Sequence, residues 1–488
     1  MASVSPPYAA DETTLLPPEL GRLLSHQVRG VTCDSRAVRP GYLFVAIRGF
    51  RDDGHRYLAD AVARGAAGVV VGGPCADPGV PCWQVPDPRR ALALAAAAFH
   101  GHPSRRLTLI GVTGTNGKTS VSYLLDSIFR QDGRRTGLLG SVVYRMANEA
   151  AVAHLTTPQA TDIQAFLARA LARGTDTVTM EVSSHALALE RVTGCAFDAA
   201  VFTNLSRDHL DFHPSMEEYF RAKARLFHQP GAPLAVINQD DPYGRRLDAL
   251  AAGRVLPYGL TNPGPLRVEH PSPGCRGWRF TLRFPAAREE VCLPLPGSFS
   301  LYNALAAATT AWGLGLSPSR IAQGLSRVGP IPGRYGERRV GGVLTVVDYA
   351  HNPDGLTQVL RWYRERTPGR LIAVFGGRGE RDRGKRPQMG SLASELADLV
   401  IITSDSPGRE DPAAISAEVA RGIRRGNFRI ILDRRRAVAA AMRHARRADT
   451  VVITGRGQEA FQKLPAGETP FPRDRELVAL HRPPGRSG

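Results

Sequence analysis

The sequence predicts an α/β protein with three domains, each built around a sheet. An apolar, β-branched run at 106–112 leads through a glycine-rich loop into a helical pattern, which gives the order strand, loop, helix. Strand-like runs alternate with helical patterns from about 108 to 330, and a second alternation begins at about 333. A chain of 488 residues is also too long for one ordinary domain.

The first block, residues 1–107, predicts a small α/β domain. Short apolar runs (GYLFVAI, AGVVVGG and CWQVP) lie between glycine and proline turns, and the block ends at the breaker sequence GHPSRR. Its first twenty residues lack a basic segment followed by an apolar core, so we expect no secretory signal. No apolar run in the chain reaches the length of about 18 residues that a membrane-spanning helix needs.

Cysteine use and charge limit the class of protein further. The six cysteines include no C-x-x-C pair, which indicates thiols in a reducing cytoplasm and no structural zinc site. The net charge of +18 raises the possibility of nucleic-acid binding. The basic residues are, however, dispersed, mostly arginine, and not interleaved with the aromatic residues that a single-strand binder uses for stacking. Such a surface equally suits small anionic ligands such as nucleotides, so we expect no specific nucleic-acid binding.

The loop GVTGTNGKTS at 111–120 predicts a phosphate site. Its glycines let backbone N–H groups crowd around an anion, and Lys118 and Thr119 open the following helix. The usual P-loop has glycine where this chain has Val112, with Gly111 one position earlier, so the loop is a variant of that motif. The alternative is a glycine turn with a surface lysine.

Polar residues follow two further strands of the second block, where open parallel sheets place their ligands. Glu181 follows the run DTVTMEV and could complete a magnesium shell begun by Thr119 and nucleotide phosphates, or it is a capping or solvated carboxylate. The run VFTNLSRDHLDFH also ends a strand, and it places five candidate polar residues in one loop: Asn204, Asp208, His209, Asp211 and His213. Two histidines and two aspartates so close suggest a transition-metal site, but such loops often use these residues as caps and turn formers.

The third block is a second sheet of the same kind. Its strand-like runs are VLTVVDYA, LIAVFGG, DLVIITSD, RIILD and TVVITGRG. Pro330, Pro332 and Gly333 mark the join, where we expect a rigid turn or a hinge.

Ordered motifs along nearly the whole chain resemble those of the Mur ligases. They are GVTGTNGKTS, TTPQA, MEVSSHAL, FTNLSRDHLDFH, YFRAKARLF, INQDD, GSFSLYNALAA, GRYGER, VDYAHNPDGL and GERDRGKRP. The front block, with CDSRAVRPGYLFVAIRG followed by DGH, resembles the uridine-nucleotide domain of the MurE type, which adds the third amino acid to the peptidoglycan precursor.

The resemblance implies a cytoplasmic, monomeric, ADP-forming ligase of cell-wall synthesis. ATP would phosphorylate the D-glutamate carboxylate of UDP-N-acetylmuramoyl-L-Ala-D-Glu, and a diamino acid, meso-diaminopimelate, would attack the acyl phosphate. Such an intermediate needs a water-excluded site, which closure about residue 333 would provide. The implied domains are 1–107 for the UDP-muramyl substrate, 108–332 for ATP, and a Rossmann-like domain at 333–488 for the amino acid.

The resemblance also assigns residues. Those matching ATP contacts are Gly114, Thr115, Asn116, Gly117, Lys118, Thr119, Asn303, Arg334 and Asp348. Those matching magnesium ligands are Thr119, Glu181, His209 and Lys223 as a carbamate, and the catalytic set is Lys118, Glu181, His209 and Lys223. Those matching contacts to the muramyl-nucleotide are Ser35, Arg36, Thr156, Thr157, Ser183 and Arg191. Without the resemblance, Lys223 would be an ordinary lysine on a helix surface; carbamylation would turn it into an anion that can face magnesium.

Departures from the family pattern fall where the amine is chosen. Ligases of meso-diaminopimelate carry Asp-Asn-Pro-Arg, whose arginine grips the distal carboxylate, whereas this chain has Gly408 in place of that arginine and Arg409 one position later. Either Arg409 reaches round or the distal carboxylate is not recognised. The amino-acid positions in this chain are Arg381, Asp405, Arg409, Gly455 and Glu459. Further departures are Arg456, Gln458 and Leu189, which replace the usual lysine, histidine and glutamine.

These departures leave room for a Mur ligase paralogue with a different acceptor or amine. A folylpolyglutamate-type ligase shares the phosphate loop and the carbamate, but the CDSR front block and TTPQA argue against it. A nucleotide-regulated binding protein without catalysis would need only the loop, so Glu181, His209, Lys223, Arg334 and Asp348 argue against that class.

Overall fold

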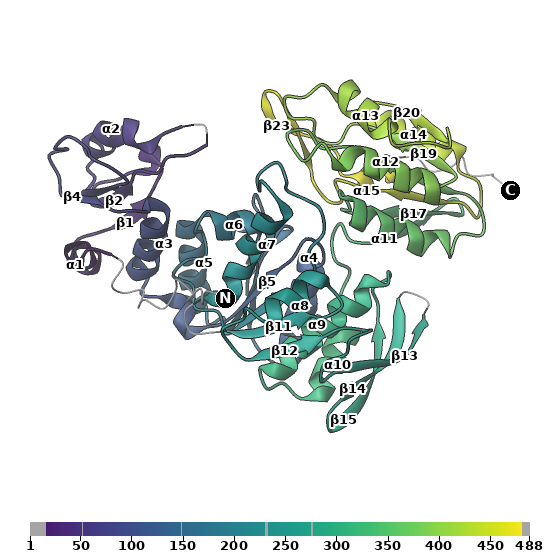
Figure 1. The fold of residues 1–488 in the computed structure, drawn as a ribbon, viewed down its shortest axis with the longest axis horizontal. Coiled ribbons are helices and arrows are strands. Elements are labelled where there is room, and N and C mark those ends of the chain that lie inside the picture. The colour runs from purple at the N-terminus through teal and green to yellow at the C-terminus, as the bar shows by residue number, and fades with distance from the viewer. Residues whose placement is uncertain (1–15, 51, 148, 230–232, 275–276, 481–488) are drawn as a thin grey trace, which may run out of the picture.

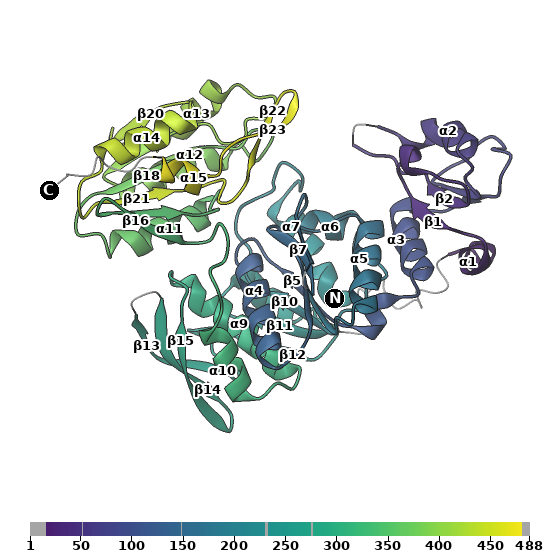
Figure 2. The ribbon, with the colours of Figure 1, turned by 180° about the vertical axis from the view of Figure 1, so that it is seen from behind.

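The computed structural model describes residues 16–50, 52–147, 149–229, 233–274 and 277–480. Three lobes follow one another in chain order (Figures 1 and 2), and their mixed α/β sheets confirm the predicted fold class. Cys275, and most of the segment in which we expect no secretory signal, lie outside the described residues. Among the residues described, every helix is too short or too polar to span a membrane.

The N-terminal lobe is a parallel four-stranded sheet in the order β1-β2-β3-β4, flanked by three helices. The strands are β1 (Gly30–Thr32), β2 (Tyr42–Val45), β3 (Gly68–Val71) and β4 (Cys82–Gln84), and the helices are α1 (Pro18–His26), α2 (Leu58–Ala63) and α3 (Pro88–Phe99). Helix α3 is rich in alanine, and Asp87 caps it by accepting hydrogen bonds from its first backbone N–H groups. Its small side chains allow close packing against both the sheet of this lobe and α5 of the next.

The central lobe is built on an eight-stranded sheet in the order β12-β11-β10-β5-β9-β6-β7-β8. It is parallel from β12 to β6, and β7 and β8 extend it as antiparallel strands. Its strands are β5 (Thr108–Thr113), β6 (Thr136–Leu139), β7 (Val143–Met146), β8 (Glu149–Val152), β9 (Thr177–Glu181), β10 (Ala199–Phe202), β11 (Leu234–Asn238) and β12 (Val255–Tyr258). Because β5 pairs with β9 and β10, the carboxyl ends of these three strands meet at one edge.

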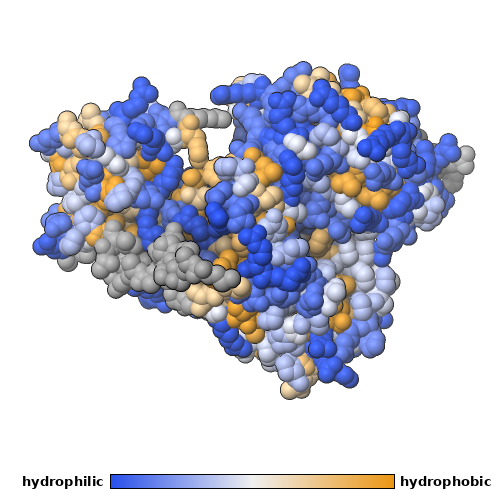
Figure 3. All heavy atoms as spheres, in the orientation of Figure 1, coloured by the Kyte–Doolittle hydropathy of each residue, from blue (hydrophilic) through white to orange (hydrophobic). Residues whose placement is uncertain are grey.

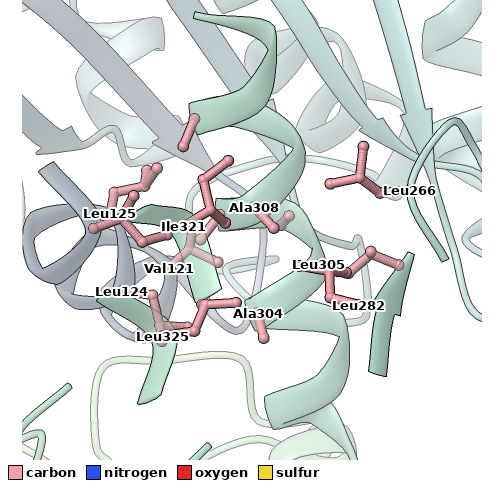
Figure 4. Close-up of a cluster of buried hydrophobic side chains, with 14 of the residues drawn as sticks. Val121, Leu124, Leu125, Leu266, Leu282, Ala304, Leu305, Ala308, Ile321 and Leu325 are labelled. Carbon is pink, nitrogen blue, oxygen red and sulfur yellow. The ribbon is translucent and has the colours of Figure 1, made fainter. Parts of the chain in front are cut away.

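The helices of this lobe cover both faces of the sheet. They are α4 (Lys118–Gln131), α5 (Ala160–Ala172), α6 (Ser184–Ala188), α7 (Met216–Ala224), α8 (Pro242–Asp248), α9 (Phe299–Gly313) and α10 (Pro318–Ser326). Val121, Leu124 and Leu125 of α4 pack against side chains of α9 and α10 in a continuous apolar core (Figure 4). This core anchors the helix that starts at the glycine loop.

A three-stranded antiparallel sheet adds to the central lobe. It consists of β13 (Arg267–Pro273), β14 (Trp278–Phe284) and β15 (Ala287–Leu293). The pattern from about 108 to 330 predicted one alternation of strands and helices, so this sheet was not predicted. Phe280, Leu282 and Phe284 are buried, while their neighbours along β14 are more accessible. Leu282 points toward α9 in Figure 4, so this sheet extends the core.

The C-terminal lobe has a six-stranded sheet in the order β16-β17-β21-β18-β19-β20, in which only the β16–β17 pair is antiparallel. Its strands are β16 (Gly336–Val340), β17 (Val343–Val347), β18 (Leu371–Phe375), β19 (Leu399–Ile402), β20 (Phe428–Ile430) and β21 (Thr450–Ile453). The helices are α11 (Pro353–Arg364), α12 (Lys385–Leu396), α13 (Pro412–Ala420), α14 (Arg434–His444) and α15 (Asp474–Ala479), and β22 (Phe461–Leu464) and β23 (Gly467–Pro470) form a separate hairpin.

A buried ion pair ties two helices of the C-terminal lobe together. Arg434 donates two hydrogen bonds of 2.7 Å to the Asp474 carboxylate, and neither side chain is exposed. We expect Asp474→Ala to lower the free energy of unfolding by about 3–5 kcal/mol, because it leaves a buried arginine without its counter-charge. Glu468→Ala removes the exposed partner of Lys463 in the same lobe and should cost less than about 1 kcal/mol. Chemical denaturation monitors both variants; equal losses would contradict the expectation.

Candidate active site

A cavity of about 340 Å³ lies between the central and C-terminal lobes. Its walls come from the glycine loop, the carboxyl ends of β9 and β10, and the loops that follow β17 and β18. The face of the molecule in Figure 3 is mostly hydrophilic, with a notch between the N-terminal and C-terminal lobes. The cavity therefore gathers segments from two sheets at their carboxyl edges, where open α/β sheets bind ligands.

The glycine loop has the backbone geometry of an anion site. Gly114 and Gly117 have φ of +144° and +88°, and a Cβ at either would collide with the Thr203 hydroxyl or the Asn303 side-chain oxygen. Thr203 Oγ1 donates to the carbonyl oxygen of Asn116 at 2.6 Å. The loop is therefore held against the end of β10, with the N-terminus of α4 directed at the cavity.

Lys118 begins α4 and folds back over the loop. Its Nζ donates to the carbonyl oxygens of Gly114 and Thr115, each at 2.8 Å. Burial lowers its pKa. The alternative of a surface lysine beside a glycine turn is therefore wrong, because this ammonium group lines the cavity.

Glu181, at the end of β9, is 1% exposed and hydrogen-bonded. Its carboxylate accepts from the hydroxyl of Thr119 at 3.0 Å and from the backbone N–H of Ser141 at 2.9 Å. Arg334 of the C-terminal lobe donates to the same Thr119 hydroxyl at 3.1 Å. A solvated carboxylate is excluded, and the predicted pair Thr119 and Glu181 lies together on the cavity wall.

His209 presents an imidazole nitrogen with no partner. Its Nδ1 is buried and has no hydrogen bond within the part of the chain that the structure describes. Burial holds the pKa of His209 well below its usual range, so the ring is neutral, which is the form that binds metals. Its backbone φ of +56° is the strained, left-handed conformation that a tight loop imposes.

The other acidic and imidazole groups of the DHLDFH loop have protein partners. Asp208 accepts from Lys385 at 2.8 Å, Asp211 accepts from Arg381 at 3.3 Å, and His213 Nε2 lies 2.9 Å from the hydroxyl oxygen of Ser184. Within the described ranges, no group of three or more histidine, cysteine or acidic side chains has the arrangement of a metal site. A dedicated transition-metal site in this loop is therefore not supported.

Lys223 on α7 is 1% exposed, so its reading as a helix-surface lysine is wrong. Its Nζ donates to the carbonyl oxygen of Gly114 at 2.8 Å and lies 4.7 Å from the centre of the Tyr219 ring. Burial, helped by repulsion from Lys118, holds the pKa of Lys223 well below its usual range. The structure thus places an amine that readily becomes neutral directly beneath the phosphate loop.

The C-terminal lobe and α9 complete the cavity. Asn303, Arg334 and Asp348, all predicted to contact nucleotide, line it. Asp348 accepts from the backbone N–H groups of Tyr335 and Ala350, each at 2.8 Å, which fixes its carboxylate.

Polar contacts join the two lobes around this cavity. Arg207 donates to Asp382 at 2.8 and 3.1 Å, and the Asn116 side-chain amide donates to Asp354 at 2.8 Å. The Lys385–Asp208 pair is nearly fully buried. The loop after β10 and the phosphate loop therefore both contact the C-terminal lobe.

The residues predicted for the muramyl-nucleotide divide into two sets. Thr156, Thr157, Ser183 and Arg191 line the cavity on the side of the central lobe. Ser35 and Arg36 do not line it. They lie in the N-terminal lobe on the short 3₁₀ helix Ser35–Ala37, where the Arg36 guanidinium is exposed and pairs with Asp34. The structure therefore places the two sets in different lobes.

The residues predicted for the amino acid are also not all brought together. Arg381 lines the cavity, whereas Asp405, Gly455 and Glu459 gather behind it and Arg409 is exposed. Several cavity residues of this lobe were not predicted from the sequence, among them Tyr349, His351, Arg378 and Lys385. A signal was present for Arg378, because it follows the apolar run LIAVF at a strand end.

Comparison with known proteins matches most of the chain to ligases. Three family models match it: "Mur ligase family, catalytic domain" at 27–100, "Mur ligase middle domain" at 112–311 and "Mur ligase, glutamate ligase domain" at 333–457. A UDP-N-acetylmuramoyl-L-alanyl-D-glutamate--2,6-diaminopimelate ligase of Caldanaerobacter subterraneus subsp. tengcongensis is 41% identical over 455 residues, covering 92% of this chain and 94% of the relative. The ligase of that name from Streptomyces avermitilis is 42% identical over 459 residues, covering 91% and 90%.

Solved structures agree with the sequence relatives. A structure of a UDP-N-acetylmuramoyl-L-alanyl-D-glutamate--2,6-diaminopimelate ligase superposes with a TM-score of 0.65 at 32% identity, covering 93% of this chain and 95% of the other. Folylpolyglutamate synthase of Mycobacterium tuberculosis has a TM-score of 0.60 at 20% identity and covers 75% of this chain and 92% of its own. At 20% identity, the similarity to folylpolyglutamate synthase is a similarity of fold alone.

Proposed function

The chain belongs to the Mur ligase family, and from this membership we propose that its cavity is the active site of an ATP-dependent, ADP-forming ligase of peptidoglycan synthesis. The assigned reaction joins 2,6-diaminopimelate to the D-glutamate of UDP-N-acetylmuramoyl-L-alanyl-D-glutamate. The observation that carries the assignment is identity of about 40% over nine-tenths of the chain to ligases named for this reaction.

A carboxylate is a poor electrophile, and the proposed mechanism activates it. ATP supplies the γ-phosphoryl group, which passes to the substrate carboxylate and leaves ADP. The phosphate loop would hold the transferring phosphates through its N–H groups, and Lys118 would leave its two carbonyl partners to neutralise them. The amine then attacks the acyl phosphate, forms the amide and releases inorganic phosphate.

Magnesium fits the donor set of the cavity. The hydroxyl of Thr119, the carboxylate of Glu181 and the partnerless Nδ1 of His209 are the groups that would hold it. The bound ion would screen the charge of the phosphates. Glu181 is in turn oriented by Ser141, which keeps the carboxylate in place without the ion.

We further propose that Lys223 is used as a carbamate. A neutral amine attacks CO₂, forming an N–C bond and releasing one proton, so the lowered pKa of Lys223 favours the modification. The product is an anion beneath the phosphate loop, where it would balance Lys118 and magnesium. Without it, two amines would lie close together in a buried site.

The three lobes receive separate roles in this proposal. Residues 1–107, with Ser35 and Arg36, would bind the uridine nucleotide; 108–332 would bind ATP; and 333–488 would bind the diamino acid. The muramyl-nucleotide would then extend from the N-terminal lobe to Thr157, Ser183 and Arg191. The proposal includes a cytoplasmic monomer, and it gives nucleic acid no role because the basic groups of the cavity suit small anionic substrates.

Phosphate release by the purified protein tests the assignment. We expect release only when ATP, Mg²⁺, the muramyl-dipeptide nucleotide and an amine are all present, with meso-diaminopimelate used better than lysine or ornithine. Mass spectrometry of the nucleotide product would show the added diamino acid. Release that proceeds without the muramyl-nucleotide, or an unchanged nucleotide, would contradict the proposed reaction.

A further inference from the structure

The position where the family pattern has an arginine holds a glycine in a backbone conformation that other residues rarely adopt. Gly408 has φ of +59°, and a Cβ there would lie 2.5 Å from Oε2 of Glu380. The next residue, Arg409, is exposed and makes no hydrogen bond or ion pair with any residue that the structure describes. Neither Gly408 nor Arg409 therefore provides a cation that protein contacts fix in place at the cavity.

A different arginine fills this role. Arg378 follows β18, lines the cavity, and has a side chain only 15% exposed. Its guanidinium lies over the Tyr349 ring, 5.0 Å from the ring centre, and donates to the carbonyl oxygen of Gly455 at 2.8 Å. A guanidinium held by an aromatic face and a carbonyl is preorganised, so little rotamer freedom is lost when it binds an anion.

Two carboxylates accompany Arg378. Glu459 accepts from its Nη2 at 2.9 Å, and Oδ1 of Asp405 lies 3.6 Å from its Nε. Neither oxygen of Asp405, nor Nε of Arg378, has a hydrogen-bond partner among the residues that the structure describes, although all three atoms are buried. Unsatisfied buried groups of both signs are costly unless a ligand completes them.

The cluster has the charge pattern that an amino-acid head group requires. The remote end of 2,6-diaminopimelate carries an ammonium group and a carboxylate on one carbon atom, so it needs an acceptor beside a donor. Glu459 and Arg378 present these two groups 2.9 Å apart. Lysine has the ammonium group but lacks the remote carboxylate, so a cation positioned for that carboxylate separates the two amines.

We propose that Arg378 binds the remote carboxylate of the diamino acid, beside the carboxylates of Glu459 and Asp405 that the family resemblance already assigns to the amino acid. The inference rests on the proposed function and specifies how this chain recognises its amine. The arginine that selects the amine therefore lies in the loop after β18, whereas the family motif places it in the loop after β19.

Two other arginines near the cavity donate hydrogen bonds to groups outside the proposed amine pocket or do not line the cavity. Arg381 donates to Asp211 of the central lobe. Arg456 is fully buried, does not line the cavity, and donates to the carbonyl oxygens of Glu459 and Phe461. Arg378 is therefore the cavity arginine whose partners all belong to the proposed pocket.

The test compares kcat/KM for meso-diaminopimelate with kcat/KM for lysine. In Arg378→Met we expect the ratio to fall by roughly 100-fold, because a buried carboxylate loses its donor. The KM values for ATP and the muramyl-nucleotide should not change. Arg378→Lys keeps the positive charge but lacks the planar guanidinium that can donate two parallel hydrogen bonds to a carboxylate, so it should give an intermediate ratio. Thermal unfolding of each variant identifies any loss of fold, which would lower both rates together and leave the ratio intact.

Two further variants make the result decisive. Arg436→Met, an exposed arginine of the same lobe with a side chain 84% exposed, is the matched control for arginine removal. Arg409→Met is the competing variant: loss of selectivity there, with the ratio retained in both Arg378 variants, would overturn the inference. Wild-type protein that turns over no amine at all would instead refute the proposed function, so the two failures are distinguishable.

Discussion

Replacing Lys223 with alanine is expected to lower kcat by at least roughly 10³-fold, with partial recovery when formate or acetate is added. The variant removes the anion proposed to balance Lys118 and magnesium, and losses of this order follow removal of one preorganised electrostatic group. It also opens a space beneath the carbonyl of Gly114 that a small carboxylate can enter. Steady-state phosphate release with and without the added acid measures both effects.

Two observations separate a carbamate from a purely structural lysine. NMR of protein equilibrated with ¹³CO₂ should show a carbamate signal in the wild type that is absent from Lys223→Ala. Lys463→Ala, which removes a lysine with a side chain 57% exposed, controls for surface modification. Turnover of Lys223→Ala at the wild-type rate would remove the carbamate from the mechanism.

Lys118→Ala should lower kcat/KM for ATP by about 10²–10³-fold. Lys118 is the cation that lies on the phosphate loop, and the charge of the transferring phosphoryl group needs a donor there. Single-turnover measurement of ADP formation isolates this step from amine attack. The fold should survive, since the variant frees two loop carbonyls that water can reach from the cavity.

The matched control is Lys118→Arg, which keeps the charge but presents it as a broad planar fork. It should retain nucleotide binding while losing most of the rate. Equal ADP formation by Lys118→Ala and the wild type would show that the loop binds phosphate without its lysine.

The phosphate loop and the three sheets could be predicted because their signals are local. Strand, glycine loop and helix follow one another within about 25 residues around Lys118, and each step has its own residue pattern. Glu181 was located by the same rule, since it ends an apolar strand. The sheet β13–β15 was missed because two hairpins were absorbed into an expected alternation with helices.

The remaining parts of the site depend on contacts between distant residues. Lys223 has the sequence context of a surface lysine, and only the family resemblance marked it, because its burial arises from packing against a loop 109 positions away. Lys385 pairs with Asp208 across 177 positions and between lobes. Arg378 was not predicted, because it follows β18, whereas the family motif for the amino acid lies after the neighbouring strand β19.

The contacts between the central and C-terminal lobes also bear on how turnover responds to ionic strength. Asn116, Arg207 and Asp208 of one lobe meet Asp354, Asp382 and Lys385 of the other, and each of these groups can exchange its partner for water. Trp278 of the central lobe also packs against Trp362 of the C-terminal lobe, with ring centres 5.3 Å apart, so parting the lobes uncovers apolar surface as well as polar groups. Added salt screens the half-exposed Arg207 pair far more than the buried Lys385 pair. We therefore expect added salt to weaken the contact between the two lobes mainly at the Arg207–Asp382 pair.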